Sequence, residues 1–69
     1  MLSPLRTKRF FNEMSIYDLG KITGIDPARI SLIERDYKVP REDEKEKIAQ
    51  ALGCEVEEIF PRVEEPSNG

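Results

Sequence analysis

Residues 15–40 read SIYDLGKITGIDPARISLIERDYKVP, and this stretch decides the fold because it predicts two short amphipathic helices joined at a single glycine. Ser15 is a suitable cap for the first helix, which is expected to run to about Thr23. Asp18 adds a favourable negative charge to its first turn. Gly24 ends the helix, since glycine enters the left-handed conformation at little cost.

The second helix of this stretch begins directly after the glycine. Asp26 is expected to cap it, and Pro27 takes its first position, where a missing amide hydrogen has no cost. Ile30 and Ile33 then form an apolar stripe that predicts a buried face. Two short helices with so tight a connection are typical of a helix-turn-helix, a motif that binds DNA.

Three further helices are expected outside this stretch, over residues 3–12, 41–52 and 55–60. No sustained alternation of apolar and polar residues predicts a strand. The sequence therefore predicts an all-α fold, a compact five-helix bundle, in one domain over residues 1–61. Residues 62–69 are polar and are expected to form a disordered tail.

Much of the chain resembles the Cro and phage-repressor class of helix-turn-helix proteins, also called the XRE-like family. The resemblance covers roughly residues 5 to 60 and implies a lambda-repressor-like DNA-binding domain. It rests on an ordered set of residues: Met14-Ser15, Asp18-Leu19-Gly20, Thr23-Gly24-Ile25, Ile30-Ser31, Ile33-Glu34-Arg35, Pro40, Lys47-Ile48-Ala49, Ala51-Leu52-Gly53 and Glu57-Glu58-Ile59-Phe60.

The expected core is aliphatic, because the chain has no tryptophan and only five other aromatic residues, three Phe and two Tyr. Gly20 stands where the family usually has alanine, and a close approach between helices is the expected compensation. The side chains expected to face inward are Leu5, Arg9, Asn12, Leu19, Ile22, Ile25, Ile30, Ile33, Ile48, Ala49, Leu52, Val56, Ile59 and Phe60.

An inward arginine requires a partner, because an unpaired buried charge is strongly unfavourable. Members of the resembled family often pair an arginine at the place of Arg9 with the glutamate that matches Glu34. The resemblance therefore implies an ion pair between Arg9 and Glu34 that ties the first helix to the third.

The net charge of −3 disfavours nucleic-acid binding at first sight. Residues 1–40, however, carry seven basic and five acidic side chains, whereas residues 41–69 carry four and nine. The half that contains the motif is thus positive, which allows weak attraction to DNA phosphates. The acidic run over residues 42–46 is expected to be an exposed helix face.

The composition excludes most enzyme chemistry and metal sites. The chain has no histidine, one isolated cysteine, Cys54, and no glycine-rich phosphate loop, so we expect no enzyme, no cofactor and no small-molecule ligand. Cys54 is expected to be a partly buried thiol. Because no apolar run approaches 18 residues and no cleavable leader is evident, a soluble cytoplasmic protein without a membrane partner is expected.

The resemblance implies that the start of the helix at Pro27 enters the major groove of DNA. Arg29 alone among the outward side chains can hold guanine by two hydrogen bonds, whereas Ala28 and Leu32 suit thymine methyl groups. The outward set is Pro27, Ala28, Arg29, Ser31 and Leu32. Phosphate anchors are expected from the amides that open the helix at Ser15 and from Tyr17, Arg35, Tyr37 and Lys38, with Lys8 and Lys21 as further candidates.

Two features leave a second function open. Ile16 stands where many relatives have a glutamine that contacts phosphate, and Phe10 and Phe11 form an apolar pair that suits a partner surface or a contact with the segment around Val63. The leading hypothesis is a bacterial or phage transcriptional regulator that binds double-stranded DNA as a homodimer. The alternative is a protein-interaction module of the same fold, such as an antitoxin-like or adaptor subunit, with weak or no DNA binding.

Overall fold

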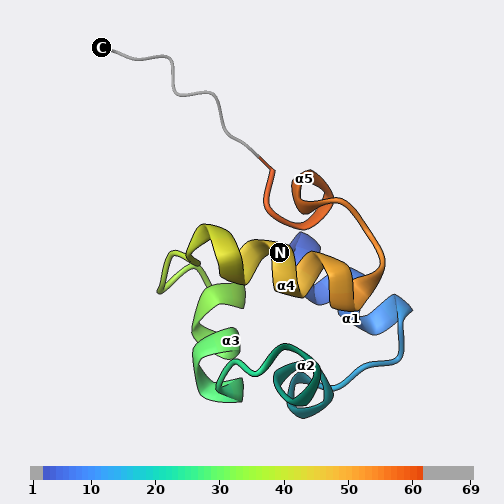
Figure 1. Ribbon diagram of the computed structural model, residues 1–69, viewed down its shortest axis with the longest axis horizontal. Coiled ribbons are helices and arrows are strands. Elements are labelled where there is room, and N and C mark those ends of the chain that lie inside the picture. The colour runs from blue at the N-terminus through green and yellow to red at the C-terminus, as the bar shows by residue number, and fades with distance from the viewer. Residues whose placement is uncertain (1–2, 62–69) are drawn as a thin grey trace.

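The computed structural model describes residues 3–61 and contains five helices and no strand in that range. Figure 1 shows α4 across the middle of the molecule, with α1 behind it, α3 running down from one end of α4 and α2 below. The all-α five-helix expectation is confirmed, and the polar tail expected over residues 62–69 lies outside the described residues. The helices are α1 (Pro4–Phe11), α2 (Ile16–Thr23), α3 (Pro27–Glu34), α4 (Glu42–Leu52) and α5 (Val56–Ile59).

The turn between α2 and α3 is built as its residues predict. Asp18 N donates to Ser15 Oγ and Ser15 N donates to Asp18 Oδ2, both at 3.0 Å, so the two residues cap α2 reciprocally. Gly24 ends α2 in the left-handed conformation, with φ of 77°. Ala28 N then donates to Asp26 Oδ1 at 2.9 Å, which caps α3.

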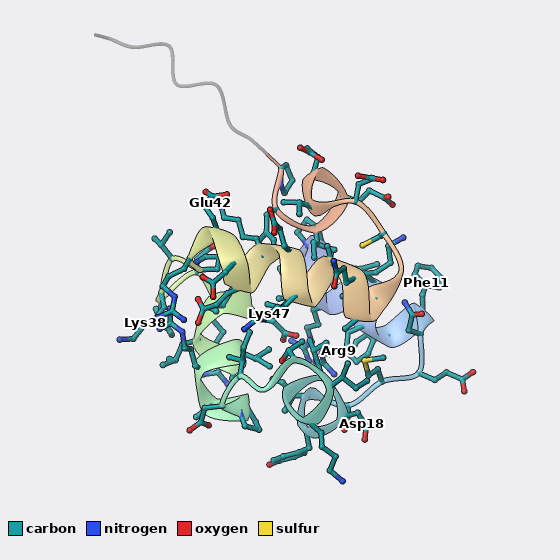
Figure 2. All side chains as sticks on the ribbon, in the orientation of Figure 1. Arg9, Phe11, Asp18, Lys38, Glu42 and Lys47 are labelled. Carbon is teal, nitrogen blue, oxygen red and sulfur yellow. The ribbon has the colours of Figure 1, made fainter. Side chains whose placement is uncertain are left out.

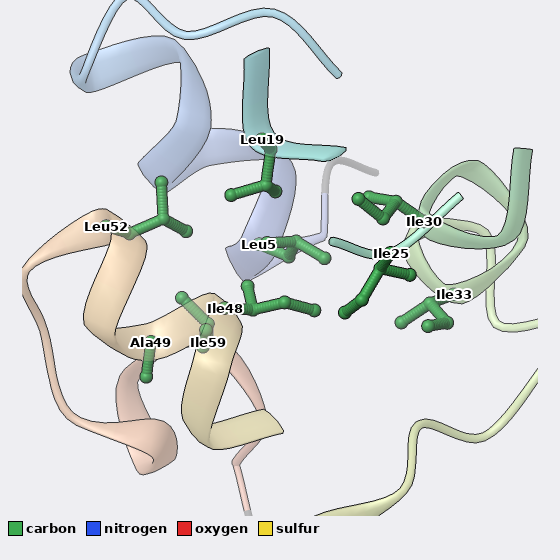
Figure 3. Packing of buried hydrophobic residues seen from close by; sticks show 9 residues of the cluster. All are labelled: Leu5, Leu19, Ile25, Ile30, Ile33, Ile48, Ala49, Leu52 and Ile59. Atoms are coloured by element: carbon green, nitrogen blue, oxygen red, sulfur yellow. The ribbon is translucent and has the colours of Figure 1, made fainter. Parts of the chain in front are cut away.

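One aliphatic cluster holds all five helices together (Figure 3). Leu19, Ile30 and Ile48 are fully buried, and they come from α2, α3 and α4. Burying such side chains is the main source of stability in a domain this small. The cluster consists of Leu5, Leu19, Ile25, Ile30, Ile33, Ile48, Ala49, Leu52 and Ile59.

Gly20 lies at the closest approach between α2 and the chain that follows it. A Cβ atom at this position would lie 2.8 Å from the carbonyl oxygen of Ile25 and 2.9 Å from Pro27 Cγ. The close approach that was expected to compensate for glycine within a helix is therefore present.

Ile22 was expected in the core, and this prediction is wrong, because 60% of the residue is exposed. The buried face of α2 consists of Leu19, Gly20 and Thr23, so it is rotated away from Ile22. Thr23 satisfies its hydroxyl within the helix by donating to the Leu19 carbonyl at 2.7 Å.

Asn12 was also expected to face inward, and it is exposed instead. It caps the C-terminus of α1, where its Nδ2 donates to the Lys8 carbonyl at 2.9 Å. In α5 only Ile59 is fully buried, while Val56 and Phe60 are half-buried and pack against the edge of the core.

Candidate nucleic-acid interface

The start of α3 forms one exposed corner of the molecule (Figure 1), while its inward residues Ile30 and Ile33 pack in the core. Ala28 is exposed, and the other side chains expected to face DNA are half-buried. This surface is small and largely apolar: it consists of Pro27, Ala28, Arg29, Ser31 and Leu32.

Arg29, the expected guanine reader, is bound within the protein. Its Nε donates to Glu44 Oε2 at 2.7 Å and its Nη2 donates to Glu44 Oε1 at 2.9 Å. The ion pair joins α3 to α4, and 31% of the Arg29 side chain remains exposed. The sequence suggested an outward arginine that is free to contact DNA, whereas the Arg29 side chain is held by Glu44.

The acidic run of α4 was expected to be an exposed face, and for Glu44 this is wrong. Its side chain is only 5% exposed. Besides the two bonds from Arg29, Glu44 Oε1 accepts a hydrogen bond from the backbone amide of Arg41 at 2.8 Å. The Arg29 guanidinium, helped by that amide, lowers the pKa of Glu44 to about 2.

Arg9 and Glu34 form the ion pair that the resemblance implied. Arg9 Nε donates to Glu34 Oε2 at 2.7 Å and its Nη2 donates to Oε1 at 3.3 Å. Both side chains are at least nine-tenths buried, and Arg9 Nη1 also donates to the Met14 carbonyl at 3.0 Å. Figure 2 shows Arg9 in the middle of the molecule, between α4 and α2 in this view. The pair ties α1 to the last turn of α3.

The N-terminus of α2 carries its own negative charge. Asp18 occupies the third helical position and is exposed, and its hydrogen bonds with Ser15 lower its pKa. A helix N-terminus attracts anions, but a carboxylate already held there disfavours a phosphate at the same place. Tyr17 is exposed beside it, and Ile16 packs partly against the core.

Three candidate phosphate anchors follow α3 on an exposed turn. Arg35, Tyr37 and Lys38 are all exposed, and Lys38 points away from the molecule at its edge in Figure 2. Two backbone bonds close the turn: Asp36 N donates to the Ile33 carbonyl at 3.1 Å, and Tyr37 N donates to the Leu32 carbonyl at 2.8 Å.

A hollow of about 420 Å³ lies between Arg35, one of these anchors, and α1. Three arginines and one glutamate line it, so its net charge is positive. Sequence reasoning missed Arg6 as a member of this surface because Arg6 lies outside the helix-turn-helix and lines the same hollow as Arg35 only through the packing of α1. The hollow is lined by Ser3, Arg6, Arg9, Ile16, Ser31, Glu34 and Arg35.

The phenylalanine pair of α1 lies on the surface. Phe11 is 80% exposed (Figure 2). Phe10 is half covered, since the guanidinium carbons of Arg6 and Arg9 each lie 5.4 Å from the centre of its ring. The segment around Val63, which was one expected cover for the pair, lies outside the described residues.

Residues 3–61 contain no cluster of metal-ligating side chains. No helix among them is long and apolar enough to cross a membrane. Cys54 is half-buried, and this burial raises the pKa of its thiol.

Comparison with known proteins identifies the family. The helix-turn-helix family model matches residues 12–59, which include α2, α3, α4 and α5. No curated protein and no solved structure matches the chain. The matched family is one of DNA-binding regulatory domains and not of enzymes. The chain therefore belongs to the Cro and phage-repressor type of helix-turn-helix family, also called XRE-like.

Proposed function

We propose that the protein is a sequence-specific transcriptional regulator that places the start of α3 in the major groove of DNA. The observation that carries this proposal is the exposed corner at the start of α3, with Arg29 on it and the positive hollow beside it. Base contacts fall to Pro27, Ala28, Arg29 and Leu32, with Ser31 at the edge of the set.

Phosphate contacts lie on both sides of this corner. Tyr17 belongs to the start of α2, and Arg35, Tyr37 and Lys38 belong to the turn after α3. Arg6 joins them through the hollow that it shares with Arg35. Since Asp18 opposes a phosphate at the amides of α2, these side chains supply most of the attraction to DNA.

The active form is a homodimer that acts on DNA in the cytoplasm. One domain of this size contacts few base pairs, and paired half-sites about one helical turn apart raise both affinity and specificity. A palindromic binding site is the expected consequence.

Selection from a random duplex library tests this function. The protein at moderate salt is expected to enrich a palindrome, and the mass of the complex on that duplex is expected to equal two protein chains. Enrichment of a site without symmetry, to which one chain binds, would contradict the homodimer but not specific DNA binding. A folded protein that enriches no sequence would contradict specific DNA binding.

A protein-interaction module on the same fold is the second candidate, and the exposed Phe11 favours it. Phe10 and Phe11 are its partner surface, and the net charge of −3 weakens DNA attraction in general. Chromatography on heparin at low salt separates the two candidates. Firm retention that salt reverses supports DNA binding, whereas a folded protein that flows through supports the interaction module.

A further inference from the structure

The Arg29 guanidinium has two usable edges, and the protein occupies only one of them. Nε and Nη2 form the edge that donates to the two oxygens of Glu44. The guanidinium carries five N–H donors, so Nη1 and the second Nη2 hydrogen form another edge. No hydrogen bond within residues 3–61 engages Nη1, and 31% of the side chain is exposed.

Glu44 is held independently of Arg29. It is the third residue of α4, and its Oε1 accepts the Arg41 amide at 2.8 Å, which fixes the carboxylate to the helix N-terminus. Its side chain is 5% exposed. The carboxylate is therefore a rigid support, and the arginine that it holds has little rotational freedom.

Arg29 is expected to keep this support when DNA is bound. Withdrawing the arginine would leave a buried carboxylate without its main partner, and this costs more than one base contact returns. Any contact between Arg29 and a base must then use the Nη1–Nη2 edge.

We propose that Glu44 is a specificity-determining positioning residue, which holds Arg29 by its Nε–Nη2 edge and so presents the Nη1–Nη2 edge to O6 and N7 of one guanine. The inference rests on the proposed function. Because the arginine is already ordered in the free protein, the base contact loses little conformational entropy on binding. Glu44 itself touches no base in this arrangement.

Three variants separate the positioning of Arg29 by Glu44 from base recognition by Arg29. Arg29→Lys keeps a cation for Glu44 but has no second edge. Glu44→Gln keeps an oxygen for the Arg41 amide but loses the second charged acceptor for Arg29. Glu46→Gln is the matched control, since it removes the same charge from an exposed position of α4.

The measurement is the equilibrium affinity of each folded protein for the duplex selected by the wild type and for three duplexes in which the preferred guanine pair is replaced. The wild type is expected to prefer guanine about tenfold at one position of each half-site. Arg29→Lys is expected to abolish that preference and Glu44→Gln to reduce it severalfold, while Glu46→Gln retains it. The affinity of Glu46→Gln for an unrelated duplex is expected to equal that of the wild type.

The outcomes separate this inference from the function on which it rests. If the wild type selects no sequence, both fail. If it selects a site but Arg29→Lys retains the guanine preference, the edge assignment is wrong and the function stands. An unchanged preference in Glu44→Gln would remove the positioning role, and a stronger preference would mean that Glu44 withholds Arg29 from DNA. Should Glu44→Gln melt below the assay temperature, Glu44→Asp replaces it, because its shorter side chain cannot keep both Arg29 contacts.

Discussion

Two ion pairs hold α3 at its two ends. Arg29 joins the first turn of α3 to Glu44 of α4, and Arg9 of α1 joins Glu34 in its last turn. Both carboxylates are more than nine-tenths buried, unlike that of the Glu58 pair at the surface. Buried pairs of this kind add little net stability but become costly when one partner is removed. They therefore fix the placement of α3 more than they strengthen the fold.

Replacing Arg9 by alanine is expected to destabilise the protein by about 3 kcal/mol, because Glu34 would remain buried without its partner. This is a large fraction of the stability of so small a domain. Thermal unfolding followed by circular dichroism measures the loss. Lys8→Ala is the control: it removes a partly exposed pair with Glu58 and is expected to change stability by less than about 1 kcal/mol. Equal melting temperatures of Arg9→Ala and Lys8→Ala would contradict a structural role for Arg9.

Acid is expected to weaken the fold through Glu44. Folding lowers the pKa of this carboxyl from 4.5 to about 2, so its stabilising contribution is complete above that unfolded value and disappears as the pH falls through the range between the two. Urea unfolding of wild type and Glu44→Gln at a series of pH values isolates the contribution. The wild type is expected to be more stable at neutral pH, and the difference should narrow below pH 4.5. A difference in the free energy of unfolding that stays constant across this pH range would show that the charge of Glu44 does not contribute to stability.

At the scale of the helices, local chemistry was enough to predict where α2 begins and ends and where α3 begins. Ser15 and Asp26 accept amide bonds from residues two or three positions away, and Gly24 needs only its own conformation. Ile22 was misplaced because α2 has two adjacent apolar faces and only packing selects between them. Gly20 allows the close approach that turns the other face inward.

The candidate site was predictable only where it lies within the helix-turn-helix. The outward residues of α3 follow from helical geometry, whereas the burial of Glu44 depends on how closely the start of α4 approaches α3. A run of acidic residues contains no signal that distinguishes Glu44 from its exposed neighbour Glu46. The capping position three residues after Arg41 was the available hint, since a glutamate there is held to the helix end.

Gly20→Ala tests whether the approach of α2 to the following turn is as tight as the structure has it. Helix propensity alone favours alanine by about 1 kcal/mol. The added methyl group would lie 2.8 Å from the Ile25 carbonyl oxygen, which is backbone and cannot easily move. We expect a net destabilisation of about 1–3 kcal/mol in urea unfolding. A more stable Gly20→Ala protein would mean that α2 and the turn separate at little cost.

At the scale of the whole molecule, the net charge is small, but basic and acidic side chains are concentrated in different halves of the chain. The net charge is −3, yet the helix-turn-helix half is positive and Arg6 and Arg35 line one hollow beside it. Such a molecule is expected to approach DNA in one orientation, because its acidic α4 and α5 are repelled by phosphates. Under the proposed function, specificity and salt sensitivity are expected to reside in different residues, because α3 reads the bases whereas the turn after α3 and α1 hold the phosphates.

The proposed separation of base contacts from phosphate contacts predicts how the turn after α3 affects DNA binding. Lys38→Ala is expected to weaken binding to the selected duplex and to an unrelated duplex by the same factor, and to reduce the slope of log affinity against log salt by about 1. Lys47→Ala is the matched control, since Lys47 is an exposed lysine on α4 whose partner is Asp43 at 4.0 Å. It is expected to leave both affinities and the slope unchanged. Titrations at three or more salt concentrations measure these quantities. A loss confined to the selected duplex would make Lys38 a reader of bases. An equal effect of Lys47→Ala would place the Lys47 face of α4 against DNA and overturn the proposed orientation.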